Sequence, residues 1–173
     1  MEYKNTRIQV LDLPGIREGA KDGKGRGREV IAVARNADLI LIMIEANHPD
    51  QRRIIETELY GFGIRVNSSR PRVSIGKAMK GGITINHTVP ISKISERGIQ
   101  ATLNAYSMFN ADVVLHQDIT VDEFIDAVEG NRAYIPAVYV LSKFDLVKTP
   151  PKLPFSYIPI AAERGAGIEE LKK

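Results

Sequence analysis

Four apolar runs, each about as long as a β-strand, recur along the chain. They cover residues 7–13, 37–46, 134–141 and 155–161. The second run, ADLILIMIEA, is nearly unbroken, which is typical of a parallel strand covered on both faces. Residues 49–63 instead show a helical pattern, in which Ile54, Ile55 and Leu59 share one face, and Gly61 and Gly63 are predicted to end the helix. Strands that alternate with helices predict an α/β domain with a mostly parallel sheet.

Residues 68–130 interrupt this rhythm. The segment opens with Gly, Ser and Pro residues between short β-like pieces, and ADVVLHQ further on has the pattern of a strand. We expect a small α+β subdomain with its own core, joined to the rest of the chain at two adjacent points. The flanking residues, 1–67 and 131–173, then form one domain between them.

Two helices are predicted inside this segment. Residues 92–109 have a helical pattern, and either Ser92 or Ser95 is placed to cap the N-terminus. A second helix is predicted to begin at Thr120, because Glu123 three residues later completes a capping box.

Composition narrows the function classes only slightly. The chain has 173 residues, with 43% hydrophobic and 26% charged content, ordinary values for a globular protein. The absence of cysteine excludes disulfides and thiolate metal sites and fits a reducing cytoplasm, where we expect the protein to act. No stretch approaches the roughly 18 apolar residues of a membrane span, so we expect no membrane partner. The net charge of +3 permits an RNA or ribosome partner without demanding one.

Three short motifs follow apolar runs, at the strand ends where ligands bind in open α/β sheets. They are Asp12-Leu13-Pro14-Gly15, Ser142-Lys143-Phe144-Asp145 and Ala161-Ala162-Glu163. Each motif alone is weak, because Pro-Gly is ordinary turn chemistry and a lone S-K-x-D is more often a solvated loop. Their order, and the strand pattern before each of them, make the set far more specific.

The chain resembles the guanine-nucleotide-binding domain of P-loop GTPases, and more narrowly the developmentally regulated GTP-binding (DRG) subfamily of the Obg-like proteins. The resemblance covers essentially the whole chain and rests on the three motifs together with LDLPGIREGAKDGKGRGREVIAVARNADLILI, YGFGIRVNS, KGGI, NADV and VEGNRAYIPAVYVLSKFD. It implies a partial G domain with an inserted subdomain, at residues 68–130, that is similar to the second domain of ribosomal protein S5. It also implies a link to ribosomes and translation, and a regulatory protein as partner.

The resemblance assigns a role in binding GTP or GDP to each motif. Asp12 would hold Mg²⁺ through a water, and the backbone N–H of Gly15 would meet the γ-phosphate. The Asp145 carboxylate would accept both guanine N1–H and N2–H, a paired contact that adenine cannot make. The stem of Lys143 would cover the base plane, and the backbone N–H of Ala162 would bond guanine O6.

The residue after Gly15 is not suited to catalysis. Many G domains place a glutamine there to orient the attacking water, whereas Ile16 is apolar and cannot polarise water. We therefore assign no catalytic residue, and the resemblance implies slow, potassium-assisted hydrolysis. The basic stretch KDGKGRGR at 21–28 is either a flexible loop or a contact with ribosomal RNA or a protein partner.

Two positions depart from the family pattern. Ser142 stands where the guanine motif usually has asparagine, whose amide ties this loop to the phosphate loop. Ala161 stands where the last motif usually has serine. Each substitution costs on the order of 1 kcal/mol of loop ordering, which weakens nucleotide binding.

The phosphate-loop motif G-x-x-x-x-G-K-[ST] does not occur in the chain. We therefore expect a fragment that lacks the family's phosphate loop, first switch and TGS domain, and that binds nucleotide weakly or not at all. Two hypotheses stay open: a piece of a GTP-hydrolysing translation factor, or a non-catalytic module that binds the ribosome or a regulatory protein. Whether this chain is itself an enzyme is left open.

The expected absence of the phosphate loop and the strand before it leads to a prediction about the sheet. In the G-domain pattern, the strand before the phosphate loop lies between the strands that carry Asp12 and Met43. Without that strand, two central edges have bare N–H and C=O groups. We expect direct pairing of those two strands, a swapped partner chain, or poor order in residues 1–36.

Overall fold

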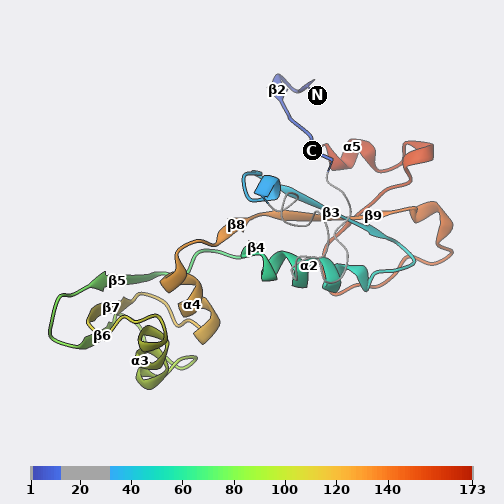
Figure 1. The fold of residues 1–173 in the computed structure, drawn as a ribbon. Coiled ribbons are helices and arrows are strands. Elements are labelled where there is room, and N and C mark those ends of the chain that lie inside the picture. Colours follow the sequence, from blue (N-terminus) through green and yellow to red (C-terminus); the bar gives the residue numbers. More distant parts are fainter. Residues whose placement is uncertain (1, 13–31, 173) are drawn as a thin grey trace. The chain divides into compact units, whose positions relative to one another are not determined.

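The structure is a computed structural model that describes residues 2–12 and 32–172 (Figure 1). The chain divides into two compact units. The sheet unit comprises Met1–Ser68 and Ala133–Lys173, and the second, which we call the insert unit, comprises Ser69–Arg132.

The sheet unit is built on three parallel strands in the order β10-β9-β3. They are β3 (Ile40–Glu45), β9 (Ala137–Ser142) and β10 (Ile158–Pro159). β3 and β9 run side by side along their whole length, from Ile40 opposite Ala137 to Glu45 opposite Ser142 (Figure 1). This register sets the last residues of the two strands next to each other. They lie at the carboxyl-terminal edge of the sheet, where the sequence motifs predict a ligand.

β3 is covered on one face only in the described part of the chain. Ile42 and Ile44 are buried, whereas Leu41 and Met43 on the other face are 43% and 49% exposed. The prediction that this run is covered on both faces is therefore wrong for the described residues. An unbroken apolar run shows that both faces of a strand can be buried. Burial of the second face also needs another element to pack against it.

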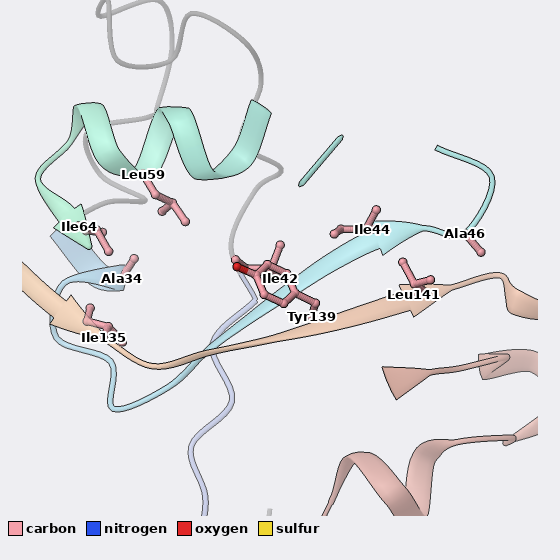
Figure 2. Packing of buried hydrophobic residues seen from close by; sticks show 9 residues of the cluster. All are labelled: Ala34, Ile42, Ile44, Ala46, Leu59, Ile64, Ile135, Tyr139 and Leu141. Carbon is pink, nitrogen blue, oxygen red and sulfur yellow. The ribbon is translucent and has the colours of Figure 1, made fainter. Parts of the chain in front are cut away.

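Helix α2 (Gln51–Gly61) packs against the buried face of the sheet. Leu59 contributes to a core whose buried members are Ala34, Ile42, Ile44, Ala46, Leu59, Ile64, Ile135, Tyr139 and Leu141 (Figure 2). The helix is followed by Gly63, whose φ of 79° lies in the left-handed region that favours glycine. The helix and its glycine stop confirm what the pattern of residues 49–63 predicted.

A proline divides the third apolar run into two strands. β8 (Ala133–Ile135) pairs in parallel with β4 (Ile64–Val66), and β9 begins after Pro136. Proline has no N–H to give to a ladder, so the run changes partners at this residue. The side chain of Asn67 bridges the break, since its Oδ1 accepts from the Ala137 N–H at 2.8 Å and its Nδ2 donates to the Ala137 carbonyl at 3.0 Å.

The prediction of a strand at residues 7–13 is wrong for residues 8–12, which form no strand. A short antiparallel hairpin of β1 (Glu2–Tyr3) and β2 (Thr6–Arg7) precedes an irregular segment. Residue 13 lies outside the described residues. A β-strand needs a hydrogen-bonded neighbour as well as apolar side chains. Among the described strands β3 pairs only with β9, so direct pairing of the first run with β3 is absent there.

The insert unit has an α+β architecture with a core of its own. Its sheet has the order β5-β7-β6, built from β5 (Val73–Lys77), β6 (Ile83–His87) and β7 (Ala111–Leu115). β5 is antiparallel to β7 and β6 is parallel to it. With α3 (Glu96–Ala105) and α4 (Val121–Glu129), the sheet encloses the buried residues Ile94, Ile99, Leu103, Ala111, Val113, Leu115, Ile119 and Phe124.

Both helices of the insert unit have side-chain caps. Ser95 caps α3, because its Oγ accepts from the Gly98 N–H at 3.1 Å. Ser92 instead donates its hydroxyl to Asp118. The predicted capping box of Thr120 and Glu123 is confirmed at the start of α4.

Candidate functional site

The carboxyl ends of β9 and β10 carry two of the three sequence motifs. Ser142 ends β9, and Lys143 follows it with φ 55° and ψ 36°, a left-handed conformation that turns the chain into a 3₁₀ turn, η2 (Phe144–Leu146). After β10, Ala161 leads into a second 3₁₀ turn, η3 (Ala162–Arg164). Because the strands are parallel and adjacent, both turns lie at one edge of the sheet.

Backbone hydrogen bonds join the two loops. The Phe144 N–H donates to the Ile160 carbonyl at 3.1 Å, and the Ile160 N–H donates to the Leu141 carbonyl at 2.8 Å. Ala161 and Ala166 exchange two bonds, of 3.0 and 3.2 Å, that close the loop around η3. The structure therefore brings the second and third motifs together, as their places after adjacent strands imply.

The loop around η3 also depends on a glycine at its end. Gly167 has a φ of 78°, and a Cβ added there would lie 2.1 Å from the Pro159 carbonyl oxygen. Glycine is thus required both by the conformation and by the close approach of two backbones. It leads directly into α5 (Ile168–Leu171).

Ser142 uses its hydroxyl inside the sheet. Its Oγ donates to the Ile44 carbonyl at 3.1 Å, and its own carbonyl accepts from the Ala46 N–H at 3.0 Å. These bonds hold the end of β9 against the end of β3. The serine that replaces the family's asparagine therefore anchors the motif to its neighbouring strand.

Lys143 forms an ion pair with the last residue of β3. Its Nζ lies 2.6 Å from Glu45 Oε1. The hydrogen bond from this ammonium, and then its charge, lower the pKa of Glu45 below the ordinary value. The contact follows from the strand register, since Glu45 lies opposite Ser142. Sequence reasoning missed Glu45, and its signal was a lone carboxylate closing an apolar run.

Asp145 forms an ion pair across to the other loop. Arg164 Nε lies 3.6 Å from Asp145 Oδ2, and the two side chains are 73% and 18% exposed. Sequence reasoning also missed Arg164, which stands immediately after the third motif. Ala162, expected to bond a ligand through its backbone N–H, is exposed in η3. Each predicted charged residue of the second motif is thus paired with a residue outside the predicted set.

The first motif is not joined to the other two in what the structure describes. Asp12 is exposed in the irregular segment and takes no part in the hydrogen bonds that connect the loops after β9 and β10. Gly15, Ile16 and the basic stretch 21–28 lie outside the described residues. Within residues 2–12 and 32–172, no group of three or more His, Cys, Asp or Glu side chains is arranged to hold a metal ion.

Two protein-family descriptions match the chain. Residues 80–173 match the C-terminal region of the MMR_HSR1 domain, and residues 1–76 match the MMR_HSR1 domain itself, described as a 50S ribosome-binding GTPase.

No helix in the described ranges is long and apolar enough to cross a membrane.

Curated relatives are similar over most of the chain. The chain is 48% identical to the developmentally-regulated GTP-binding protein 1 homolog of Dictyostelium discoideum, an alignment that covers 99% of this chain and 48% of that protein. It is 51% identical to developmentally-regulated GTP-binding protein 1 of Xenopus laevis, over 85% of this chain and 40% of that protein. For the human developmentally-regulated GTP-binding protein 2 the identity is 48%, over 85% and 41%. The chain thus spans about half the length, or less, of these relatives.

Proposed function

Because the chain belongs to the DRG family of GTP-binding proteins, we propose that it carries the guanine-recognising half of a GTP-binding domain. One observation supports this most directly. The loops after β9 and β10 lie at one edge of the sheet and are hydrogen-bonded to each other. The residues that the family resemblance assigns to the guanine base, Lys143, Asp145 and Ala162, all lie on these two loops.

The chemistry of these residues suits a guanine edge. A carboxylate has two acceptor oxygens, so Asp145 takes the N1–H and N2–H of guanine together, whereas adenine presents no donor at N1. The hydrocarbon stem of Lys143 offers an apolar surface to the flat base while its ammonium stays in water. The backbone N–H of Ala162 supplies the donor that distinguishes the O6 carbonyl of guanine from an amino group.

The phosphate half of the site is not supplied by the described residues. Mg²⁺ takes oxygen ligands, and here a single carboxylate, Asp12, is its predicted protein ligand. The γ-phosphate contact is assigned to Gly15, outside the described residues. These residues do not by themselves fit a magnesium–phosphate site, so we derive no catalytic step for this chain and propose GTP hydrolysis for the whole protein only.

We propose that the chain alone binds nucleotide weakly. A phosphate loop gives several charge-assisted hydrogen bonds, each worth about 1.5–3 kcal/mol. Losing four of them removes on the order of 6 kcal/mol, or about four decades of affinity. A micromolar Kd then rises to about 10 mM, and what remains is recognition of the base.

Titration of GDP and of ADP against the 173-residue chain, followed by NMR, tests the proposal. We expect GDP alone to shift resonances of residues 143–146 and 161–164, with a millimolar Kd. Asp145→Asn removes the preference for GDP, whereas the matched control Asp50→Asn, at the exposed start of α2, keeps it. Equal responses to GDP and ADP, or an unchanged preference in Asp145→Asn, contradict guanine recognition.

A ribosome-linked role is a second proposal, supported by the family description over residues 1–76. Sedimentation of the chain with purified 50S subunits tests it. We expect the chain to pellet with the subunits, in a manner that weakens as salt rises. A chain that stays in the supernatant at low salt contradicts this role.

A further inference from the structure

The residue expected to read guanine already has a cationic partner. The Asp145 side chain is 18% exposed, and the guanidinium of Arg164 lies 3.6 Å from one of its carboxylate oxygens. The guanidinium comes from η3, on the loop that also carries Ala162. The carboxylate that would meet the base is thus approached from the other base-facing loop.

Arginine and guanine present the same chemical group to a carboxylate. The N1–H and N2–H donors of guanine are bonded to one carbon, C2, and so form part of a cyclic guanidine. The arginine head is an open guanidinium with the same planar fork of N–H donors, and it also has a positive charge. A site built to accept the guanine fork therefore accepts this side chain as well.

We propose that Arg164 is an internal competitor of guanine, which occupies Asp145 in the nucleotide-free protein and is displaced when the base binds. The inference rests on the proposed function, because it takes Asp145 as the guanine acceptor. Arg164 would thus affect the affinity and selectivity of the site for guanine, although it is not one of the residues predicted to bind guanine.

The geometry allows the exchange at low cost. The Arg164 side chain is 73% exposed, and its 3.6 Å contact is longer than a good hydrogen bond, so it returns to water readily. The bonds between Ala161 and Ala166 fix the loop backbone independently of that side chain. Only one side chain has to rotate for the carboxylate to become available.

A second ion pair at the same edge differs, because it does not block the surface expected to meet the base. Lys143, expected to cover the base, has its ammonium 2.6 Å from Glu45 on β3. That contact holds the lysine head without using its stem, so the stem keeps its apolar surface for a base. Of the two charged residues assigned to guanine, only Asp145 has its ligand-binding atoms engaged by the internal partner.

Arg164→Gln in the full 173-residue chain tests the proposal, with GDP and ADP as probes. Exposed ion pairs are weak, so we expect the Kd for GDP to fall by about two- to fivefold, while ADP still shifts no resonances of residues 143–146 and 161–164. The direction is diagnostic, because removing a positive charge by itself weakens the binding of an anionic nucleotide. The gain should shrink at high salt.

Two further variants sharpen the test. Arg53→Gln makes the same chemical change at an exposed position of α2, and we expect GDP binding that is equal to or weaker than in the unchanged chain. Arg164→Lys keeps the charge but loses the fork, so its affinity for GDP should lie between those of the unchanged chain and Arg164→Gln. Thermal unfolding followed by circular dichroism verifies that each variant is folded.

The outcomes separate this inference from the proposed function. If the chain prefers GDP to ADP through Asp145, but Arg164→Gln binds GDP no more tightly, the competitor is overturned and guanine recognition stands. If no variant prefers GDP to ADP, both are overturned, because releasing Asp145 then uncovers no guanine site.

Discussion

The two units of this chain differ in how completely they bury the apolar side chains of their own sheets. In the insert unit, α3 and α4 complete a core in which Phe124 is fully buried, and the exposed face of the sheet carries polar residues such as Ser74 and Thr84. In the sheet unit, β3 has a partner on one side among the described strands, and its Leu41 and Met43 remain exposed. The proposed guanine site belongs to the less complete unit. The insert unit buries its apolar side chains with elements that local sequence patterns predict. The sheet unit has apolar surface that its described residues do not cover.

The largest test of this difference compares two apolar side chains. Phe124→Ala empties a fully buried position in the insert unit, so we expect the free energy of unfolding to fall by about 3–5 kcal/mol. Met43→Ala in the sheet unit truncates a side chain that is 49% exposed and should change it by less than about 0.5 kcal/mol. Urea unfolding followed by circular dichroism measures both. A loss for Met43→Ala that equals the loss for Phe124→Ala would mean that the open face of β3 is covered in solution.

A smaller effect is expected from the polar network that supports the covered face of the sheet unit. The Tyr139 hydroxyl donates to Glu56, and the Arg52 guanidinium lies 4.8 Å from the Tyr139 ring centre and 4.3 Å from that of Phe155. Tyr139→Phe removes a hydrogen bond to a charged group and should lower the free energy of unfolding by about 1.5 kcal/mol at pH 7.

The same residue predicts a pH dependence at the alkaline end. Burial first, and then the bond to Glu56, raise the pKa of Tyr139 in the folded state. A raised folded-state pKa means that this residue's contribution is complete below its unfolded pKa, near 10, and is lost as pH rises through the folded value. Stability should therefore fall more steeply above about pH 10 in the unchanged chain than in Tyr139→Phe. Parallel curves for the two proteins contradict the raised pKa.

The helix starts of the two units offer a matched comparison of about 1 kcal/mol. Thr120 and Glu123 form a capping box at α4, whereas Asp50 at the start of α2 makes no capping bond with its side chain. Thr120→Ala should cost about 1 kcal/mol in urea unfolding, and Asp50→Ala close to nothing. An equal loss in both variants would show that Asp50 caps its helix in solution.

The smallest expected effect is the titration of Glu45. Its pKa is lowered by Lys143, so its contribution to stability is present above the unfolded pKa and is lost as pH falls through the lowered folded value. Carboxylate NMR should place the midpoint below 4.5, and Lys143→Gln should return it toward that value. An unchanged midpoint in the variant means that the pair does not persist in solution.

Sequence reasoning succeeded where the signals were local. The capping box lies within one helical turn, and the stop at Gly63 within two residues of the helix it ends. In the insert unit, the strand predicted at ADVVLHQ corresponds to β7, and the two predicted helices correspond to α3 and α4. Each of these patterns is local in the sequence.

Sequence reasoning failed where a partner far along the chain decides the outcome. Residues 8–12 have the side chains of a strand, but a strand exists only beside another one. Pro136 was visible in the sequence, yet the run was read as one strand because its side chains stay apolar across the break. The Glu45–Lys143 pair joins residues 98 positions apart, so only the register of β3 on β9 reveals it.

The left-handed backbone of Lys143 has a consequence for protein engineering. Glycine or asparagine would adopt φ 55° and ψ 36° at lower cost than lysine does, so a redesign that maximises stability would replace this residue. Such a replacement would discard both the ammonium that meets Glu45 and the stem proposed to cover a base. Stability screens of this chain would then select against the proposed contact with a base, and substitutions at position 143 should show this conflict between stability and binding.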